Sequence, residues 1–531
     1  MQVRFLPGAL QARCYRPALL VSESTLEAPQ IRPAADREQP PASTPDPWTL
    51  RRFVREHPGW ALAGVLVVLS IILVLYARTR PSYDAYGWMV WGYQTLHGSL
   101  DLGGAPSWKP VPFLFTVPFA LAGHYQLWLW MITACAVALA GPVFAGHIAF
   151  RLTGGAQARE GQEPLVRYAP LAAAVFAGAA VLGLEDYFHY ILSSQSDPML
   201  VTFVLAGIDM FLLRRYRWAL WLGVLAALGR PEVWPFLGLF MLWAWFKVPR
   251  MRWMLVAGVT LIAFMWFGIP TITNGRPDIA GQLAKLSPRA LRHGRLFGTV
   301  GRFTELEYLP VWIAALCAVA WAVLRRRWVV LFLAAGTVGW VIVEIAFAYH
   351  GWPALPRYMF EAAAIGAVLA GVAVGWTLSE LPRIRRGLPR WAGVPVVVVL
   401  VAALIPGAVA RIRTERRDLR HERGRTHQIA ALQSTTDALG GARHIQNCGQ
   451  PVTNVGYVSA MAWLYHINVG FVGGLQQHVE AIQLREPIPK VLFTPLVRGG
   501  WAVHPWHTRP QQVARCRALH AVYSGGVLRR R

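Results

Sequence analysis

Two stretches of the chain place acidic side chains beside long apolar runs. The first, "RPSYDAYGWMVWG" (residues 80–92), puts Asp84 after an apolar run and among aromatic residues. The second, "LEDYFHYILSSQSDP" (residues 184–198), carries Glu185, Asp186 and Asp197. A carboxylate can take a proton from a hydroxyl nucleophile as a general base. On position alone, each acid is also explained as a solvated charge where a helix ends.

Basic side chains occur at similar boundaries. Arg230 lies in "GRPEVWP" between two short apolar runs, and Arg357 opens a later one in "LPRYMFE". The other candidates are Lys109 and, in the basic run "AKLSPRALRHGRLFGTVGR" (residues 284–302), Arg292 and Arg295. An ionisable residue at membrane depth costs about 2.5–3.5 kcal/mol, so Arg230 with Glu232 is either a structural ion pair or part of a site.

These acids and bases together suit one kind of chemistry. Arginine holds a phosphate with paired hydrogen bonds and stabilises the charge that builds on it as it leaves. A neighbouring carboxylate would activate an acceptor hydroxyl, which would attack a substrate activated by a lipid phosphate. The sequence has no P-loop and no dinucleotide-binding glycine pattern. Transfer from a lipid-linked donor would need neither.

The elements that must position these residues are membrane helices. The chain has 531 residues, of which 55% are hydrophobic and 15% charged, against about a quarter charged in soluble domains. The composition predicts an α-helical polytopic membrane protein with about eleven transmembrane helices. The predicted spans are 60–76, 125–150, 167–184, 198–213, 218–229, 233–246, 252–270, 311–324, 328–347, 357–379 and 392–410. The fifth and sixth are short and form either two spans or one broken hairpin.

The segments outside the spans differ in composition. Residues 1–58 are rich in proline, serine and charge and are expected to be a disordered cytoplasmic tail. Residues 59–410 form the predicted transmembrane catalytic domain. The valine-rich runs and glycine turns of residues 411–531 predict a small mixed α/β domain outside the cell. The prolines after Asp84 predict helices that lie along the membrane interface.

The distribution of arginine and lysine predicts the orientation. With the N-terminus inside, alternate crossings bring the short basic loops to one face, as cytoplasmic loops require. Asp84, Glu185, Asp186, Arg230 and Arg357 then collect at the outer face. One miscounted span would place the C-terminus inside instead. The formal charge of +25 comes almost entirely from arginine, with only four lysines, and is taken as codon bias and not as a sign of nucleic-acid binding.

The five cysteines show no metal-ligand spacing. Cys448 and Cys516 both fall in the C-terminal part, where a disulfide is expected if that part is outside the cell. Coincidence is an equally good explanation of the pair.

Several of these features resemble one family. The outer loop that opens on "PSYDAYGW", the acidic "LEDYFHY", the "RPE" between short helices, the "RY" at a late helix and the terminal soluble domain are similar to the GT-C superfamily of polyprenyl-phosphate-sugar-dependent glycosyltransferases of bacterial envelopes. The likeness covers most of the chain in topology, but only short motifs in sequence.

The resemblance implies an inverting hexosyl- or pentosyltransferase in the bacterial inner membrane, with Asp84 as the general base. Glu185, Asp186 and Asp197 would bind the acceptor or a divalent cation (Mg or Mn). The donor phosphate would be held by Arg357, Arg230, Lys109, Arg292 and Arg295. Tyr86 and Trp88 suit stacking on the sugar, and an aromatic belt at the membrane interface explains them equally well. Because Asp84 is followed by alanine and not by a second acid, dependence on a metal stays open.

The partners implied are a polyprenyl-phosphate-linked sugar donor, a glycan, lipid or protein acceptor, and the bilayer itself. Two other classes remain open. A transporter or flippase of lipid-linked glycans would show paired broken helices in two repeats, and no second copy of the "GRPE" hairpin is found. A membrane scaffold without catalysis would tolerate loss of Asp84 and Arg357.

Overall fold

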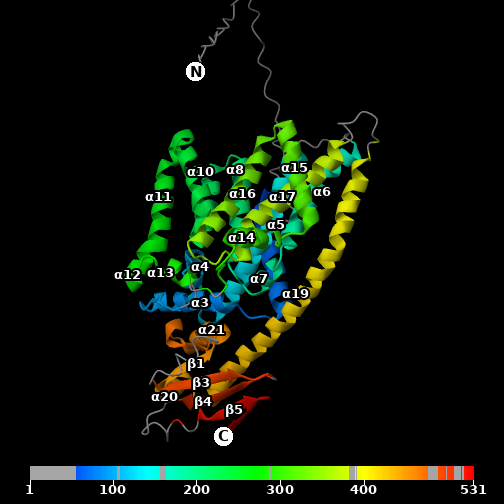
Figure 1. Ribbon diagram of the computed structural model, residues 1–531. Helices are drawn as coiled ribbons and strands as arrows, with labels where there is room; N and C mark the ends of the chain where they lie inside the picture. The colour runs from blue at the N-terminus through cyan, green and yellow to red at the C-terminus, as the bar shows by residue number, and fades with distance from the viewer. Residues whose placement is uncertain are drawn as a thin grey trace, which may run out of the picture. The chain divides into compact units, whose positions relative to one another are not determined.

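The structure is a computed structural model, and it describes residues 56–104, 108–155, 163–285, 287, 289–381, 389, 391–475, 488–497, 499–506, 516 and 519–530. The predicted tail, residues 1–58, lies almost wholly outside the described residues. The remainder is mainly helical with a small sheet near the C-terminus, which confirms the predicted fold class (Figure 1).

The longer helices, in chain order, are α2 (Pro58–Ala77), α3 (Tyr83–Leu96), α4 (Pro110–Ala120), α5 (Gln126–Leu152), α6 (Pro164–Leu182), α8 (Asp197–Leu212), α9 (Tyr216–Gly229), α10 (Trp234–Lys247), α11 (Arg252–Ala263), α14 (Arg295–Thr304), α15 (Leu309–Arg325), α16 (Trp328–Tyr349), α17 (Phe360–Ser379), α19 (Gly393–Ala438) and α21 (Val455–Tyr465). The shorter helices are η1 (Gly123–Tyr125), α7 (Tyr187–Leu192), η3 (Pro231–Val233), η4 (Pro249–Met251), η5 (Phe264–Gly268), α12 (Ile269–Asn274), α13 (Ile279–Lys285), η6 (Pro356–Met359), α20 (Ala442–Cys448) and η7 (Val469–Phe471).

Each of the predicted spans is helical, but not all are long enough to cross a bilayer alone. Within the described residues, seven helices have the length and apolar composition of a span, or up to eight if the bent pair α14 and α15 counts as one. The helices α8, α9 and α10 are shorter, with 16, 14 and 14 residues. The prediction of about eleven spans therefore corresponds to eleven apolar helical segments, several of them less than a full span. The predicted hairpin turns at Arg230 and η3.

Helix α17 is the central helix of the membrane part. It is buried along almost its whole length and packs against α5, α6, α8, α15 and α16. Its sequence, "FEAAAIGAVLAGVAVGWTLS", is rich in alanine and glycine, and small residues let helix backbones approach closely. A Cβ atom at Gly371 would lie 2.6 Å from the carbonyl oxygen of Ala173 in α6. This packing holds the N-terminal end of α17, where Arg357 lies, inside the bundle.

Helices α3 and α4 connect the first two spanning helices. They contain 14 and 11 residues, too few to cross a bilayer, as the prediction of interfacial helices requires. In Figure 1, α3 runs across the direction of the spanning helices. It packs against α4 on one side and against α21 of the C-terminal part on another. Asp84 lies in its first turn, where a negative charge interacts favourably with the helix dipole.

The predicted domain boundary at residue 410 falls inside helix α19. Helix α19 has 46 residues and continues without a break from its apolar first half, "GVPVVVVLVAALIPGAVA", into the charged "RIRTERRDLRHERGR". The change in composition marks where the helix leaves the apolar layer, and not where the helix ends. One helix is therefore shared by the membrane part and the C-terminal part (Figure 1).

The C-terminal part contains the predicted mixed sheet. The described strands are β1 (Gln450–Asn454), β2 (Gly473–Leu475), β3 (Lys490–Pro495), β4 (Trp501–Trp506), β5 (Ala521–Ser524) and β6 (Val527–Arg530), in the order β2-β1-β3-β4-β5-β6. Strand β1 pairs in parallel with β2 and β3, and the others pair antiparallel. A disulfide joins Cys448 and Cys516, whose Cα atoms lie 5.8 Å apart, a pairing that the sequence left open.

Candidate functional site

Asp84 and Arg357, far apart in the sequence, form an ion pair. Arg357 Nη2 lies 3.5 Å from Asp84 Oδ2, and the two side chains are 18% and 20% exposed. Asp84 comes from α3, and Arg357 from η6 at the entrance to α17. Pro356 occupies the first position of η6, where its fixed φ angle favours the start of a helical turn. The predicted general base and a predicted phosphate-binding cation are thus neighbours at the edge of the buried bundle.

A second carboxylate, Asp197, joins three cations below this pair. Its side chain is fully buried, and it accepts hydrogen bonds from Arg230 and from Lys109 Nζ, the latter at 3.4 Å. Arg357 Nη1 lies 4.0 Å from the other oxygen. Burial lowers the pKa of Lys109, and the charge of Asp197 opposes that shift. Asp197 was predicted to bind the acceptor or a metal, whereas the structure surrounds it with basic side chains.

Arg230 is the most highly connected of these cations. It is 3% exposed, and its guanidinium lies 3.6 Å from Glu232 and 3.8 Å from Glu361. The ring of Tyr358 lies against it, with its centroid 4.0 Å from Cζ. The guanidinium is enclosed on all these sides. Arg230, which was predicted to bind the donor phosphate, thus already has acidic and aromatic partners.

A cavity of about 460 Å³ opens beside Arg357. Its described lining contains the carboxylates Glu185, Asp186 and Glu305, the cations Arg289, Arg302 and Arg357, and Tyr190, Leu306, Leu355, Pro356 and Phe360. Two of the three predicted acceptor-binding acids therefore lie at this cavity with the best predicted donor-binding cation. Acids and bases in one cavity of this size suit a polar substrate that carries both hydroxyl groups and a phosphate.

The two acids of the second outer loop have different environments. Glu185 accepts a hydrogen bond of 2.8 Å from Arg411 Nε of α19. Asp186 has a left-handed backbone, with φ of 59°, immediately before α7. Burial, and then the charge of Glu185, raises the pKa of the Asp186 carboxyl. Glu185 is therefore held by a salt bridge, and Asp186 is the acid that remains available to a ligand.

The basic run at residues 284–302 reaches the cavity through residues other than those predicted. Arg295 donates to the carbonyl oxygen of Tyr349, at 2.9 Å, and Arg292 is exposed. Neither lines the cavity, so the prediction that they bind the donor is not supported by their positions. Arg302 and Arg289 line it instead. Arg302 donates to the carbonyl oxygens of Pro353 and Ala354, at 2.7 and 3.0 Å, just before Arg357.

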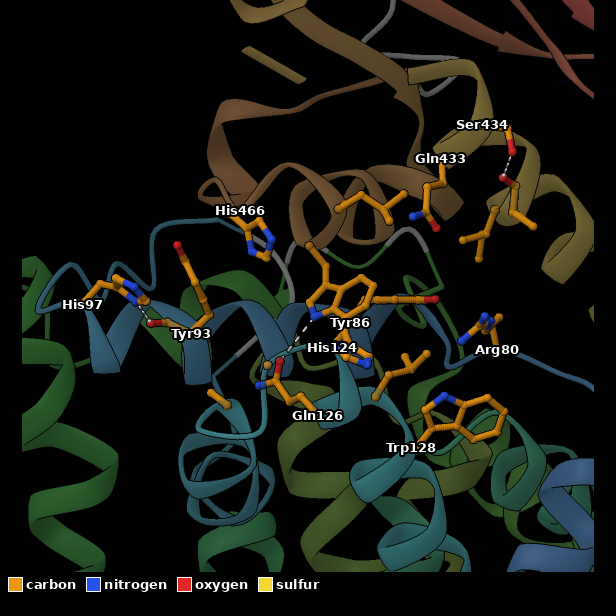
Figure 2. Close-up of a pocket in the computed structure, with 17 residues that line it drawn as sticks. Arg80, Tyr86, Tyr93, His97, His124, Gln126, Trp128, Gln433, Ser434 and His466 are labelled. Atoms are coloured by element: carbon orange, nitrogen blue, oxygen red, sulfur yellow. Dashed lines mark hydrogen bonds between the residues drawn. The ribbon is translucent and has the colours of Figure 1, made fainter. Parts of the chain in front are cut away.

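The predicted sugar-stacking residues lie apart from this cavity. Trp88 is fully buried, with its ring 5.7 Å from that of Trp130 and 5.7 Å from Lys109 Nζ. Tyr86 is 1% exposed and packs on Trp463, with ring centroids 5.6 Å apart. Trp88 thus belongs to the core. Tyr86 lines a different cavity, formed by parts of α3, α5, α19 and α21 (Figure 2).

An apolar groove of about 850 Å³ runs beside the candidate site. Its walls come mainly from α6 and α19, with Val175, Phe176, Val397, Val401 and Leu404 among the lining residues. Its polar end contains Glu307, Arg411, Glu415 and Arg416. Arg411 Nη2 also donates to the carbonyl oxygen of Leu306, at 2.9 Å, and Leu306 lines the cavity beside Arg357. The groove and the cavity are therefore neighbours.

Sequence reasoning missed several charged residues of this region. Glu361 and Glu344 are buried acids inside apolar runs, and their position at membrane depth was the signal that could have found them. Arg302 and Arg411 lie in basic runs in which no residue stands out by type. For metal binding, no three His, Cys, Asp or Glu side chains converge anywhere in the described ranges.

The fold and the site define a polytopic helical membrane protein with an acid–base cluster at one end of its bundle. In comparisons with known proteins, no family model matches, and neither does any curated protein. Among solved structures, the chain is similar to ArnT from Cupriavidus metallidurans in the apo state, with 15% identity and a TM-score of 0.45 over 82% of this chain and 93% of that one. The same protein bound to undecaprenyl phosphate gives 14% identity and a TM-score of 0.43 over 83% and 93%.

Proposed function

We propose that this protein is a membrane glycosyltransferase that moves a sugar from a polyprenyl-phosphate donor to an acceptor hydroxyl. The observation that carries the proposal is the contact of Asp84 with Arg357 at 3.5 Å, at the edge of a bundle whose neighbouring cavity holds further acids and arginines. In a single displacement the attacking and leaving oxygens lie on opposite sides of one carbon, so a base and a phosphate-binding group must flank that carbon from neighbouring positions. Substrate would therefore enter between Asp84 and Arg357 and separate the ion pair that they form without it.

In the proposed reaction, Asp84 takes the proton of the acceptor hydroxyl as its oxygen attacks the anomeric carbon of the donor. The bond between that carbon and the phosphate oxygen breaks, and polyprenyl phosphate leaves with the bonding electron pair. One displacement inverts the configuration of the carbon. Arg357 stabilises the charge that develops on the phosphate, since its planar guanidinium can donate two parallel hydrogen bonds. Before substrate binds, Asp84 and Arg357 neutralise each other.

The apolar groove supports a lipid-linked donor. A polyprenyl chain needs apolar surface that is open to the bilayer, and the groove provides it between α6 and α19. Its polar end lies beside Leu306 and the cavity. A chain in the groove would bring its phosphate past the arginines at that end to Arg357, and its sugar toward Asp84. Arg411 is thus a further candidate for contact with the phosphate.

Replacing Arg357 with lysine tests the role of the guanidinium. The single ammonium group of lysine cannot donate two parallel hydrogen bonds, so R357K is expected to weaken binding of polyprenyl phosphate about tenfold or more. Binding is measured with the purified protein in nanodiscs, and transfer with a panel of polyprenyl-phosphate sugars. R295K is the matched control, because Arg295 donates to a backbone carbonyl away from the cavity. Equal affinity for R357K and wild type would remove Arg357 from the donor site.

We propose that the active site faces the outside of the plasma membrane. The disulfide between Cys448 and Cys516 supports this orientation, because disulfides persist in oxidising compartments. Both cysteines are expected to resist alkylation in intact cells until a reductant is added. Cys135 and Cys317, which are free cysteines among the described residues, serve as the internal reference. Their alkylation without reductant measures how much of the protein is unfolded.

Peptide mass spectrometry before and after reduction measures the alkylation. Replacing both cysteines with serine is expected to lower the stability of the C-terminal part by about 2–5 kcal/mol, since the bond closes a long loop. Rapid alkylation of Cys448 and Cys516 without reductant would argue against an oxidised pair and against an outer location.

A further inference from the structure

A second cavity shares no described lining residue with the one beside Arg357. Its volume is about 680 Å³, within the usual range of ligand pockets. Its described lining comes from α3, the start of α5, the C-terminal half of α19, and α21. Asp84 and Tyr86 differ by about 200° around the helix axis, which is why the first points to Arg357 and the second to this cavity.

Aromatic rings line the cavity at several places. Tyr93 lies between His97 and His466, with ring centroids 4.1 and 4.8 Å away. Tyr86 lies farther along, and Trp128 is at the other end (Figure 2). Trp128 is 38% exposed, so part of its ring is free to contact a ligand. Aromatic faces spread over one cavity suit a ligand with several flat apolar faces.

The polar groups of the cavity are mostly uncharged. Gln433 and Ser434 project toward it from α19 (Figure 2) and are exposed. None of the described residues that line it is Asp, Glu or Lys, and Arg80 is the single strong cation. The Arg80 guanidinium lies over the Trp128 ring, 5.6 Å from its centroid. Burial and the nearby His97 lower the pKa of His466, which keeps its imidazole neutral at pH 7.

The wall of the cavity is anchored by polar contacts. Gln126 Nε2 donates to the carbonyl oxygens of Met89 and Thr116, each at 3.0 Å. Gln126 Oε1 accepts from Trp463 Nε1 at 3.3 Å. One buried amide thus connects α3, α4, α5 and α21. Because this amide is fully used, the wall between the membrane part and the C-terminal part is fixed before any ligand arrives.

We propose that this cavity binds the neutral sugars of a glycan acceptor, beyond the sugar that reacts. Sugar rings present apolar C–H faces that stack on aromatic rings, and hydroxyl rims that pair with amides, hydroxyls and imidazoles. A polyanion would find one arginine only, a cation would find no carboxylate in the described lining, and a lipid chain would leave the polar groups unpaired. This proposal rests on the proposed function, which supplies the need for an acceptor. It narrows the class of acceptor from lipid, protein or glycan to glycan.

The test measures binding without donor, so that it does not depend on transfer. The full-length protein in nanodiscs is applied to an array of neutral and anionic oligosaccharides, and the best neutral ligand is titrated by calorimetry. Trp128→Ala and Gln433→Ala are each expected to weaken binding about tenfold or more. The first loses a stacking face, and the second loses a pair of hydrogen bonds. The matched controls are Trp253→Ala, at a tryptophan that is 85% exposed elsewhere, and Gln282→Ala, whose side chain is exposed on α13.

Each result supports or contradicts the proposal. Neutral oligosaccharides that bind wild type and both controls, but bind the two cavity variants weakly, support it. No neutral binding, a preference for anionic oligosaccharides, or equal binding by all variants would overturn it. Thermal unfolding checks that the variants fold. Asp84→Asn is expected to bind the oligosaccharide normally. Binding without transfer would therefore contradict the proposed enzyme alone, and transfer without binding would contradict the glycan cavity alone.

Discussion

Replacing Asp84 with asparagine is expected to lower the rate of sugar transfer by about 10²–10⁴-fold, the usual contribution of a general base. Asparagine keeps the size and hydrogen-bonding ability of the side chain but cannot accept the proton of the acceptor hydroxyl. Asp84 is 20% exposed, and Arg357 retains Asp197 at 4.0 Å when Asp84 is neutral. The variant is therefore expected to fold. Membranes that contain equal amounts of wild type and variant are assayed with a panel of polyprenyl-phosphate sugars.

Two control variants separate loss of the base from loss of charge. Asp278→Asn removes an exposed acid before α13 and should transfer at the wild-type rate. Asp84→Glu keeps the carboxylate but moves it, so its rate should lie between those of wild type and D84N. Full activity in D84N would show that Asp84 is an interfacial charge, and would direct the search for the base to Asp186. If wild type uses no donor at all, transport of lipid-linked glycans becomes the better hypothesis.

Replacing Asp197 with asparagine is expected to cost about 3–5 kcal/mol of stability, because it leaves buried cations without their common partner. Asp197 is fully buried between Arg230, Lys109 and Arg357. In the variant, Arg230 still has Glu232 and Glu361 as ion-pair partners, and Arg357 still has Asp84. Lys109 has Asp197 as its only ion-pair partner within the described ranges. Thermal unfolding in nanodiscs measures the loss.

A second substitution tests this explanation. Lys109→Met removes the cation that D197N leaves without a partner. The double variant should therefore lose less stability than the sum of the losses in the two single variants. Coupling energies between contacting residues are about 0.5–3 kcal/mol, well within the reach of a double-mutant cycle. Strictly additive losses of stability would mean that Lys109 and Asp197 do not stabilise each other. Wild-type stability of D197N would mean that water or another group replaces the carboxylate.

Much of the fold follows from local patterns in the sequence. Apolar runs predict the helices, since a backbone in lipid must satisfy its hydrogen bonds within the segment. The prolines in "GRPEVWP" predict a break, and α9 ends at Gly229, just before it. The alternation of valine-rich runs with glycine turns predicts the C-terminal sheet. The predicted boundary at residue 410 also comes from composition, which reports where a helix leaves the apolar layer, whereas α19 itself continues past that point.

The candidate site, like the fold, was predictable from the sequence in part. The sequence by itself determined that Asp84, Asp197, Arg230 and Arg357 are charges beside apolar runs, and that Arg230, at membrane depth, needs a partner. Only the tertiary structure decided which partner each one has. Four arginines lie between residues 289 and 302, and their types are identical, so nothing local distinguishes Arg302, which lines the cavity, from Arg295, which does not.

The physical reason is that ion pairs are made between segments that are distant in the chain. Asp84 meets Arg357 because the small residues of α17 let that helix pack at the centre of the bundle, with η6 at its start, and because the first turn of α3 brings Asp84 to η6. Trp88 and Tyr86 are both aromatic and close in sequence, yet one faces the core and the other a cavity. Residue type indicated which side chains could take part in a site, and helix packing determined which partners each side chain contacts.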